Sequence, residues 1–142
     1  MTNHAGLSDK VLTKNVRSPL NASGTVTNSA VIDMQGWDGA RFVINLGVLG
    51  TNGTVDARVM QDDNSGLNTL TAITNAALTQ VVNANTVHII DVFRPTERYL
   101  ALQTTGHTNG AVISATVDLY RGNGRVLPPT QSAEQYVRVA AS

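Results

Sequence analysis

The stretch Pro95–Thr105, PTERYLALQTT, decides the fold class of this 142-residue chain. A proline-marked turn leads into an Arg-Tyr pair and then into a strictly alternating segment. Leu100 and Leu102 point to one face of this segment, while Tyr99 and Gln103 point to the other. Alternation with a period of two residues is typical of a half-buried β-strand. Nothing in the stretch forms a catalytic pattern, so we interpret it as part of a β scaffold.

The same alternation recurs on both sides of this stretch. Residues 40–46 place Phe42, Ile44 and Leu46 on one face. Residues 54–62 alternate as well, with Val55, Ala57 and Val59 predicted inward and Asp56, Arg58 and Met60 predicted outward. Residues 111–120 form the longest run, and their predicted inward side chains are Ala111, Ile113, Ala115, Val117 and Leu119. These segments predict further strands.

The segment from Leu67 to Val82 is ambiguous. Residues 70–73 are typical of a strand, whereas residues 75–80 fit either a helical turn or a short strand. Thr and Asn are poor helix formers, which argues against a long helix. The whole chain then has about seven or eight short strands, roughly 10–15 residues apart, with turn signals between them. This pattern is typical of an antiparallel sandwich or barrel, and a jelly roll is one such solution. We predict an all-β fold, an antiparallel β-sandwich that is jelly-roll-like, with extended N- and C-terminal arms.

The polarity of the chain divides it into three parts. Residues 1–29 are rich in Ser, Thr, Asn and Gly and are predicted to form an N-terminal arm with one short strand. Residues 30–125 are predicted to form the sandwich body. Residues 126–142 carry the pair Pro128-Pro129 and are predicted to be an extended C-terminal tail, because proline disfavours helix at and before itself. Within this tail, residues 134–139 fit an edge strand.

Composition excludes several classes of site. The chain has no cysteine, which rules out disulfides, thiolate zinc sites and thiol nucleophiles. Ten basic and ten acidic residues give a net charge of zero, so the basic footprint of a nucleic-acid-binding protein is missing. No signal peptide and no apolar run of membrane-spanning length is visible, and we expect no membrane partner. Only 14% of residues are charged, which suits a subunit of an assembly.

No catalytic or metal-binding pattern emerges. The histidines His4, His88 and His107 are far apart in sequence, and we expect His88 on a strand surface and the other two in loops. Residues 62–66, DDNSG, are similar to the start of a calcium loop, but the twelfth position is Ile73 instead of a glutamate. Turn chemistry explains them better. We therefore expect neither an enzyme nor a protein with a cofactor or bound metal.

Five residues are candidates for an interface. Trp37 stands between Gly36 and Asp38 in a turn, where it either caps the end of the core or contacts a partner. The other four candidates lie in the strand predicted within the tail: Tyr136, Val137, Arg138 and Val139. An edge strand of this kind pairs readily with a neighbouring sheet.

An ordered set of motifs carries a family resemblance across residues 30–130. The set begins with residues 31–34 and the GWDG turn of residues 36–39, followed by the RFVI strand of residues 41–44. It continues through Gln61-Asp62-Asp63, Arg98-Tyr99-Leu100 and residues 114–117, and leaves through Arg121-Gly122 to Leu127-Pro128-Pro129. This set resembles the small structural proteins of tailed bacteriophages, which include the head decoration, or cement, proteins.

The resemblance implies a jelly-roll subunit, often a homotrimer, on the outer surface of the virion capsid. Such a subunit binds the major capsid protein between capsomers and holds the expanded head against internal DNA pressure. Several modest contacts on a fixed lattice add up to tight binding. Two alternatives stay open: another virion part, such as a head–tail connector or tail accessory protein, and a carbohydrate-binding β-sandwich.

Overall fold

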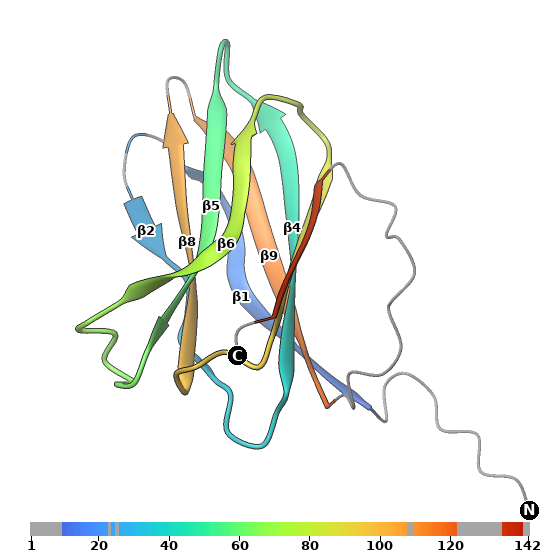
Figure 1. Ribbon diagram of the computed structural model, residues 1–142. Coiled ribbons are helices and arrows are strands. Elements are labelled where there is room, and N and C mark those ends of the chain that lie inside the picture. Colours follow the sequence, from blue (N-terminus) through green and yellow to red (C-terminus); the bar gives the residue numbers. More distant parts are fainter. Residues whose placement is uncertain (1–9, 23, 25, 108–109, 122–134, 141–142) are drawn as a thin grey trace, which may run out of the picture.

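The structure is a computed structural model that describes residues 10–22, 24, 26–107, 110–121 and 135–140. These residues form ten β-strands in two sheets that face each other (Figure 1). None of the described segments is a helix long and apolar enough to cross a membrane. The predicted all-β sandwich is confirmed.

The first sheet has five strands in the order β1-β9-β4-β7-β10. Neighbouring strands are antiparallel except β10, which runs parallel to β7. The strands are β1 (Val11–Ala22), β9 (Ala111–Tyr120), β4 (Gly39–Leu49), β7 (Val87–Phe93) and β10 (Gln135–Ala140).

The second sheet is antiparallel and has the order β2-β8-β5-β6, with the short β3 pairing the same strand β8 as β2 does. Its strands are β2 (Val26–Asn28), β3 (Ile32–Asp33), β5 (Thr54–Asp62), β6 (Thr71–Val81) and β8 (Tyr99–His107). The opening stretch of sequence is therefore the turn into β8 and most of this central strand. The jelly-roll form of the sandwich stays a prediction.

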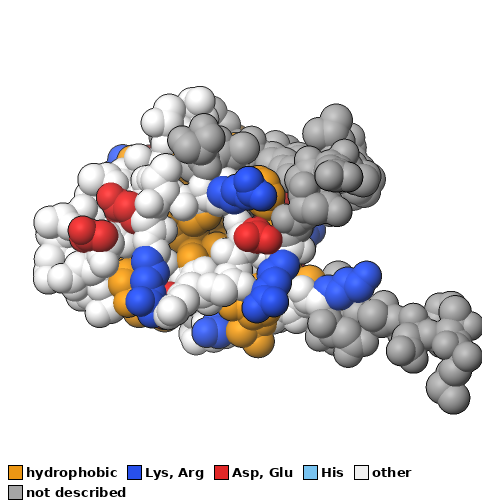
Figure 2. Space-filling view, turned by 60° about the horizontal axis from the view of Figure 1, so that its bottom comes forward, with side chains coloured by type: hydrophobic (Ala, Val, Ile, Leu, Met, Phe, Trp, Pro, Cys, Tyr) orange, Lys and Arg blue, Asp and Glu red, His pale blue; other side chains and the backbone are white. Residues whose placement is uncertain are grey.

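Most of the surface that is visible at one end of the molecule is uncharged. Figure 2 shows one end of the molecule, where scattered basic and acidic side chains lie among backbone and uncharged polar groups. A surface of this kind agrees with the small charged fraction of the sequence.

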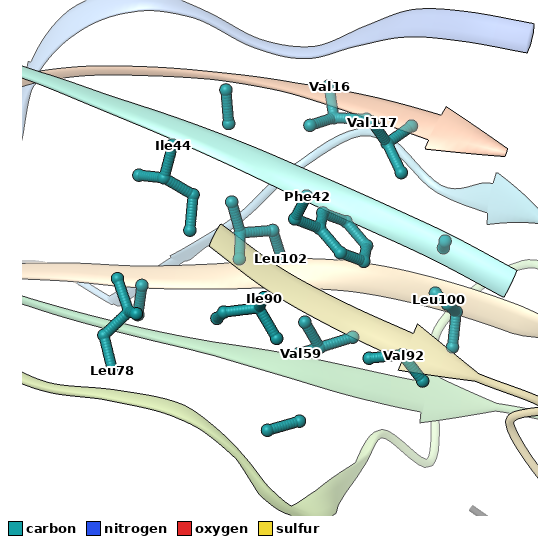
Figure 3. Packing of buried hydrophobic residues seen from close by; sticks show 14 of the residues in the cluster. Val16, Phe42, Ile44, Val59, Leu78, Ile90, Val92, Leu100, Leu102 and Val117 are labelled. Carbon is teal, nitrogen blue, oxygen red and sulfur yellow. The ribbon is translucent and has the colours of Figure 1, made fainter. Parts of the chain in front are cut away.

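The core lies between the two sheets and follows the alternation of the sequence. Phe42 and Ile44 of β4 face Leu100 and Leu102 of β8, and all four side chains are fully buried. Figure 3 shows these side chains pointing toward one another from opposite sheets. Burying a side chain of this size contributes about 1.5–3 kcal/mol, so each of the four helps to hold the two sheets together.

The predicted boundary of the N-terminal arm needs correction. Within residues 1–29, β1 and β2 belong to the sandwich, β1 in the first sheet and β2 in the second. The backbone of β1 pairs with β9 along almost its whole length. Arg17 is only 6% exposed, and its Nη2 donates to the carbonyl of Thr27 at 3.1 Å, which links β1 to β2. Residues 1–9 lie outside the described residues.

Three predictions for single residues are wrong. Met60 was expected to face solvent, but it is 7% exposed, because it lies between the neighbouring positions Ala101 of β8 and Ala72 of β6. His88 was expected on a strand surface, but it is fully buried in β7, on the same side as Ile90. Its Nε2 lies 2.8 Å from the hydroxyl of Thr86. His107 is the last residue of β8 instead of a turn residue.

The ambiguous segment is a strand. Residues 71–81 form one strand, β6, whose pairing with β5 contains two irregularities. Asn75 has a φ of 65°, in the left-handed region that Asn tolerates better than most residues. This kink displaces the alternation, and the inward side chains become Ile73, Ala76, Leu78 and Val81.

Candidate functional site

A hollow opens at one end of the sandwich, where the loop between β3 and β4 meets the loop between β7 and β8. Its volume is about 500 Å³. We call it the end hollow. Figure 2 looks onto this end and shows hydrophobic side chains at the bottom of a depression, with basic and acidic side chains around it.

The apolar part of the end hollow consists of Met34, Trp37 and Pro95. Trp37 is half-buried and packs against the core, so its indole ring caps the core and also lines the hollow. The guanidinium of Arg121 lies 5.7 Å from the centre of the indole ring, and its Nε donates to the carbonyl of Gly36 at 2.8 Å. These contacts fix the ring at the rim of the sandwich.

A salt bridge holds the two loops of the end hollow together. Arg98 donates from Nε to Oδ1 of Asp33 at 2.8 Å and from Nη2 to Oδ2 at 2.9 Å. The same Nη2 also donates to Oε1 of Gln35 at 2.5 Å. The hydrogen bonds from Arg98, aided by one from the backbone N–H of Gln35, lower the pKa of Asp33 to about 2. We call this pair the Asp33–Arg98 clamp, and both of its side chains are charged at any pH above this value.

Three charged residues that line the end hollow lie outside this clamp, namely Asp38, Arg94 and Glu97. Arg94 is exposed, and its guanidinium lies 5.0 Å from the centre of the Phe93 ring. Its backbone has a φ of 53°, which is strained for a side chain of this size, and its N–H donates to the carbonyl of Asp38 at 2.7 Å. Glu97 is half-buried, and its Oε2 is buried without a hydrogen-bond partner among the described residues. Both residues line the end hollow.

The C-terminal strand occupies one edge of the first sheet. Tyr136 and Arg138 pair with Ile89 and Asp91 through the backbone register of β10 and β7, but their side chains lie outside the described residues. Val137 and Val139 are half-buried and pack against the core. The predicted edge strand thus pairs within its own chain, and its outer edge has no neighbour among the described strands.

An aromatic contact covers the outer face of the first sheet next to the end hollow. The ring of Tyr120, on β9, lies over Gly39 of β4 and stacks with Phe93 of β7 at 6.5 Å between centroids. Its hydroxyl donates to Oδ1 of Asp91 at 2.5 Å. Because Gly39 has no side chain, one ring spans three neighbouring strands.

The acidic loop after β5 is built by its own hydrogen bonds. Oδ1 of Asp62 accepts from the N–H of Asn64 at 2.9 Å and from the hydroxyl of Thr69 at 2.9 Å, while Oδ2 accepts from the N–H of Thr69 at 2.7 Å. Desolvation acts to raise the pKa of Asp62, but these hydrogen bonds outweigh it and the pKa is lowered. The contacts are those of a turn. Among the residues that the structure describes, no three His, Asp or Glu side chains form a metal site.

The structure places the five predicted site residues on two separate elements, Trp37 in the loop before β4 and the other four on β10. Sequence reasoning missed Arg94 and Glu97 as site residues. The Arg-Pro pair at positions 94 and 95 marked only a turn. A comparison with models of known protein families found no match, and a search of curated proteins found no relative. The family resemblance therefore stays a prediction.

Proposed function

We propose that this chain is a capsid decoration protein of a tailed bacteriophage, which acts as a homotrimer on the outer surface of the head. Its partner is the major capsid protein, and its role is to bind between capsomers and stabilise the expanded shell. The protein is not an enzyme and needs no cofactor.

The strand order is the observation that carries this proposal. Both β2 and β3 pair with β8, so we count them as one strand and renumber the strands before β10 from 1 to 8 along the chain. In this numbering the first sheet has the order 1-8-3-6 and the second sheet the order 2-7-4-5. An order of this kind winds two Greek keys around each other and supports the jelly-roll form that the resemblance implies. The neutral, weakly charged chain supports a role in an assembly.

The outer edge of β10 is the proposed contact with the next copy or with the shell. This strand is the last of its sheet, and an edge strand offers a row of backbone donors and acceptors. A second chain that adds a strand there gains backbone hydrogen bonds, while the lattice repeats the contact many times. Arg138 and Tyr136 lie on this strand and belong to the proposed interface.

The deciding experiment is an electron cryo-microscopy reconstruction of the parent particle in which this chain is located and counted. Hundreds of copies between capsomers support the proposal. A dozen or fewer copies at one vertex or on the tail refute it in favour of a connector or tail accessory protein, and absence from the particle refutes both.

A binding assay tests the contact itself. Purified protein is mixed with expanded shells that lack it, and the bound fraction is measured by sedimentation. Arg138→Glu is expected to weaken binding, whereas Arg58→Glu, on the outer face of the other sheet, is the matched control. Equal binding of the two variants would count against the β10 interface. Removing residues 1–29 is not a usable test, because that deletion also removes β1 and β2.

A further inference from the structure

We propose that the end hollow is a binding site for a saccharide unit, which is held through its hydroxyl groups. This inference goes beyond the proposed role on the capsid and does not depend on it. It rests on residues of the β3–β4 and β7–β8 loops, which lie apart from the β10 edge.

The polar groups of the end hollow balance one another. Glu97 carries oxygens that only accept hydrogen bonds, while Arg94 carries groups that only donate, and the Arg98 guanidinium is already paired with Asp33. An anion meets the carboxylate of Glu97 here, and a cation meets the guanidinium of Arg94. A neutral polyol avoids both problems, because each hydroxyl group donates one hydrogen bond and accepts others.

Glu97 supplies the strongest pointer to a ligand. Its Oε2 is buried without a partner among the described residues. A buried acceptor without a donor is costly, and native proteins rarely leave one. A hydroxyl of a ligand in the end hollow satisfies this oxygen without bringing a charge next to Arg94.

The floor of the end hollow completes the site. Met34, Trp37 and Pro95 give it an apolar surface, with the indole ring held at the rim by Arg121. The carbon–hydrogen face of a pyranose ring packs on such a surface while its hydroxyls reach the polar rim. The volume of about 500 Å³ lies within the usual range of small-molecule sites.

The strained backbone of Arg94 fits a site that is formed in advance. Its positive φ places the guanidinium next to Phe93, and its N–H is fixed by the carbonyl of Asp38. Strain of this kind persists where the surroundings hold it, and it concentrates at binding sites. Because Asp38 itself lines the end hollow, this hydrogen bond ties the two loops together in addition to the Asp33–Arg98 clamp.

Intrinsic fluorescence tests the proposal directly, because Trp37 is the single tryptophan of the chain. The full chain is titrated with the methyl glycosides of glucose, galactose and N-acetylglucosamine, with a sialoside as the acidic probe and a lysine-rich peptide as the basic one. We expect a saturable change in Trp37 emission with at least one neutral glycoside. Glu97→Gln and Arg94→Ala should each weaken this binding roughly tenfold or more, as expected for the loss of a hydrogen bond to a charged group.

The matched control is Arg58→Ala, an exposed arginine on the outer face of the second sheet, which should leave the affinity unchanged. Thermal unfolding of each variant shows that the fold is kept. Three results would overturn the proposal: no saturable binding of any neutral glycoside, an equal loss in Arg58→Ala, or tighter binding of the sialoside or the peptide. None of these results bears on whether the protein decorates a capsid.

Discussion

Gly39→Ala tests how the outer face of the first sheet is held together. A Cβ atom at position 39 would lie 2.3 Å from Cζ and 2.5 Å from the hydroxyl oxygen of Tyr120. Ordinary Cβ contacts lie at 3.4–4 Å, so the ring has to retreat by about 1 Å to reach one. The hydroxyl of Tyr120 then loses its hydrogen bond to Asp91, and the ring loses its stacking with Phe93.

The magnitude follows from these two contacts. A hydrogen bond to a carboxylate contributes about 1.5–3 kcal/mol, and a stacked aromatic pair adds about 0.5–1.5 kcal/mol. Gly39→Ala is therefore expected to lower the free energy of unfolding by about 2–4 kcal/mol. In a chain that already carries Tyr120→Ala, the same change meets no ring. There it should be neutral or stabilising by up to about 1 kcal/mol, because glycine is the poorer residue in a strand.

Urea unfolding of the wild type, the two single variants and the double variant measures this coupling as a double-mutant cycle. The expected coupling energy is about 3 kcal/mol, which is well above the error of the method. Additive effects, with Gly39→Ala equally costly in both backgrounds, would refute the close approach of Tyr120 to β4.

Three further predictions concern other parts of the sandwich. Gly106→Ala should lower the free energy of unfolding by about 3 kcal/mol or more, because its Cβ would lie 2.2 Å from a backbone oxygen of β1. Gly47→Ala is the control and should be close to neutral, because its nearest contact would be at 3.4 Å. Similar melting temperatures of the two variants in thermal unfolding would contradict this. The lowered pKa of Asp33 means that its pairing with Arg98 stabilises the fold above pH 3.8 and that this contribution is lost as the pH falls toward about 2. Carboxyl NMR should find the midpoint of Asp33 near 2 in the wild type and shifted upward, toward 3.8, in Arg98→Met, where the hydrogen bond from the N–H of Gln35 remains; an unchanged midpoint would contradict this. Asp62→Asn should speed amide hydrogen exchange in the loop after β5 and lower the melting temperature, and unchanged protection there would count against the network.

The sequence was sufficient where a strand is regular and central. In β9 the five side chains predicted inward are all buried. This strand is paired on both sides, with β1 and β4, and only one of its faces meets the core. In β6 the same reasoning was not enough. Its inward positions 73, 76, 78 and 81 are spaced by three, two and three residues, a pattern that mixes helical and strand periods. The pairing of β6 with β5 shows that two register shifts cause this mixed spacing, and the sequence of β6 alone does not reveal them.

The strand β1 was hard to predict for a different reason. Of its twelve residues only Val16, Arg17 and Ala22 are buried, so its side chains carry almost no pattern. The strand forms because its backbone pairs with β9, and backbone pairing leaves no trace in composition. The end hollow was hidden in the same way, since Glu97 and Trp37 are far apart in sequence and meet only when the two loops close the same end of the sandwich.

Stability and binding are separable in this protein. The contacts that hold the sandwich, such as the Tyr120 ring over Gly39, lie on the sheets, whereas Arg94 and Glu97 lie in a loop beyond them. Even the Asp33–Arg98 clamp is nearly half exposed, and an exposed ion pair contributes little to folding. Substitutions of Arg94 and Glu97 should therefore leave the unfolding curve almost unchanged, so that a loss of glycoside binding in these variants reports on the site. A loss of shell binding in Arg138→Glu then reports on a different surface, and each proposal can fail without the other.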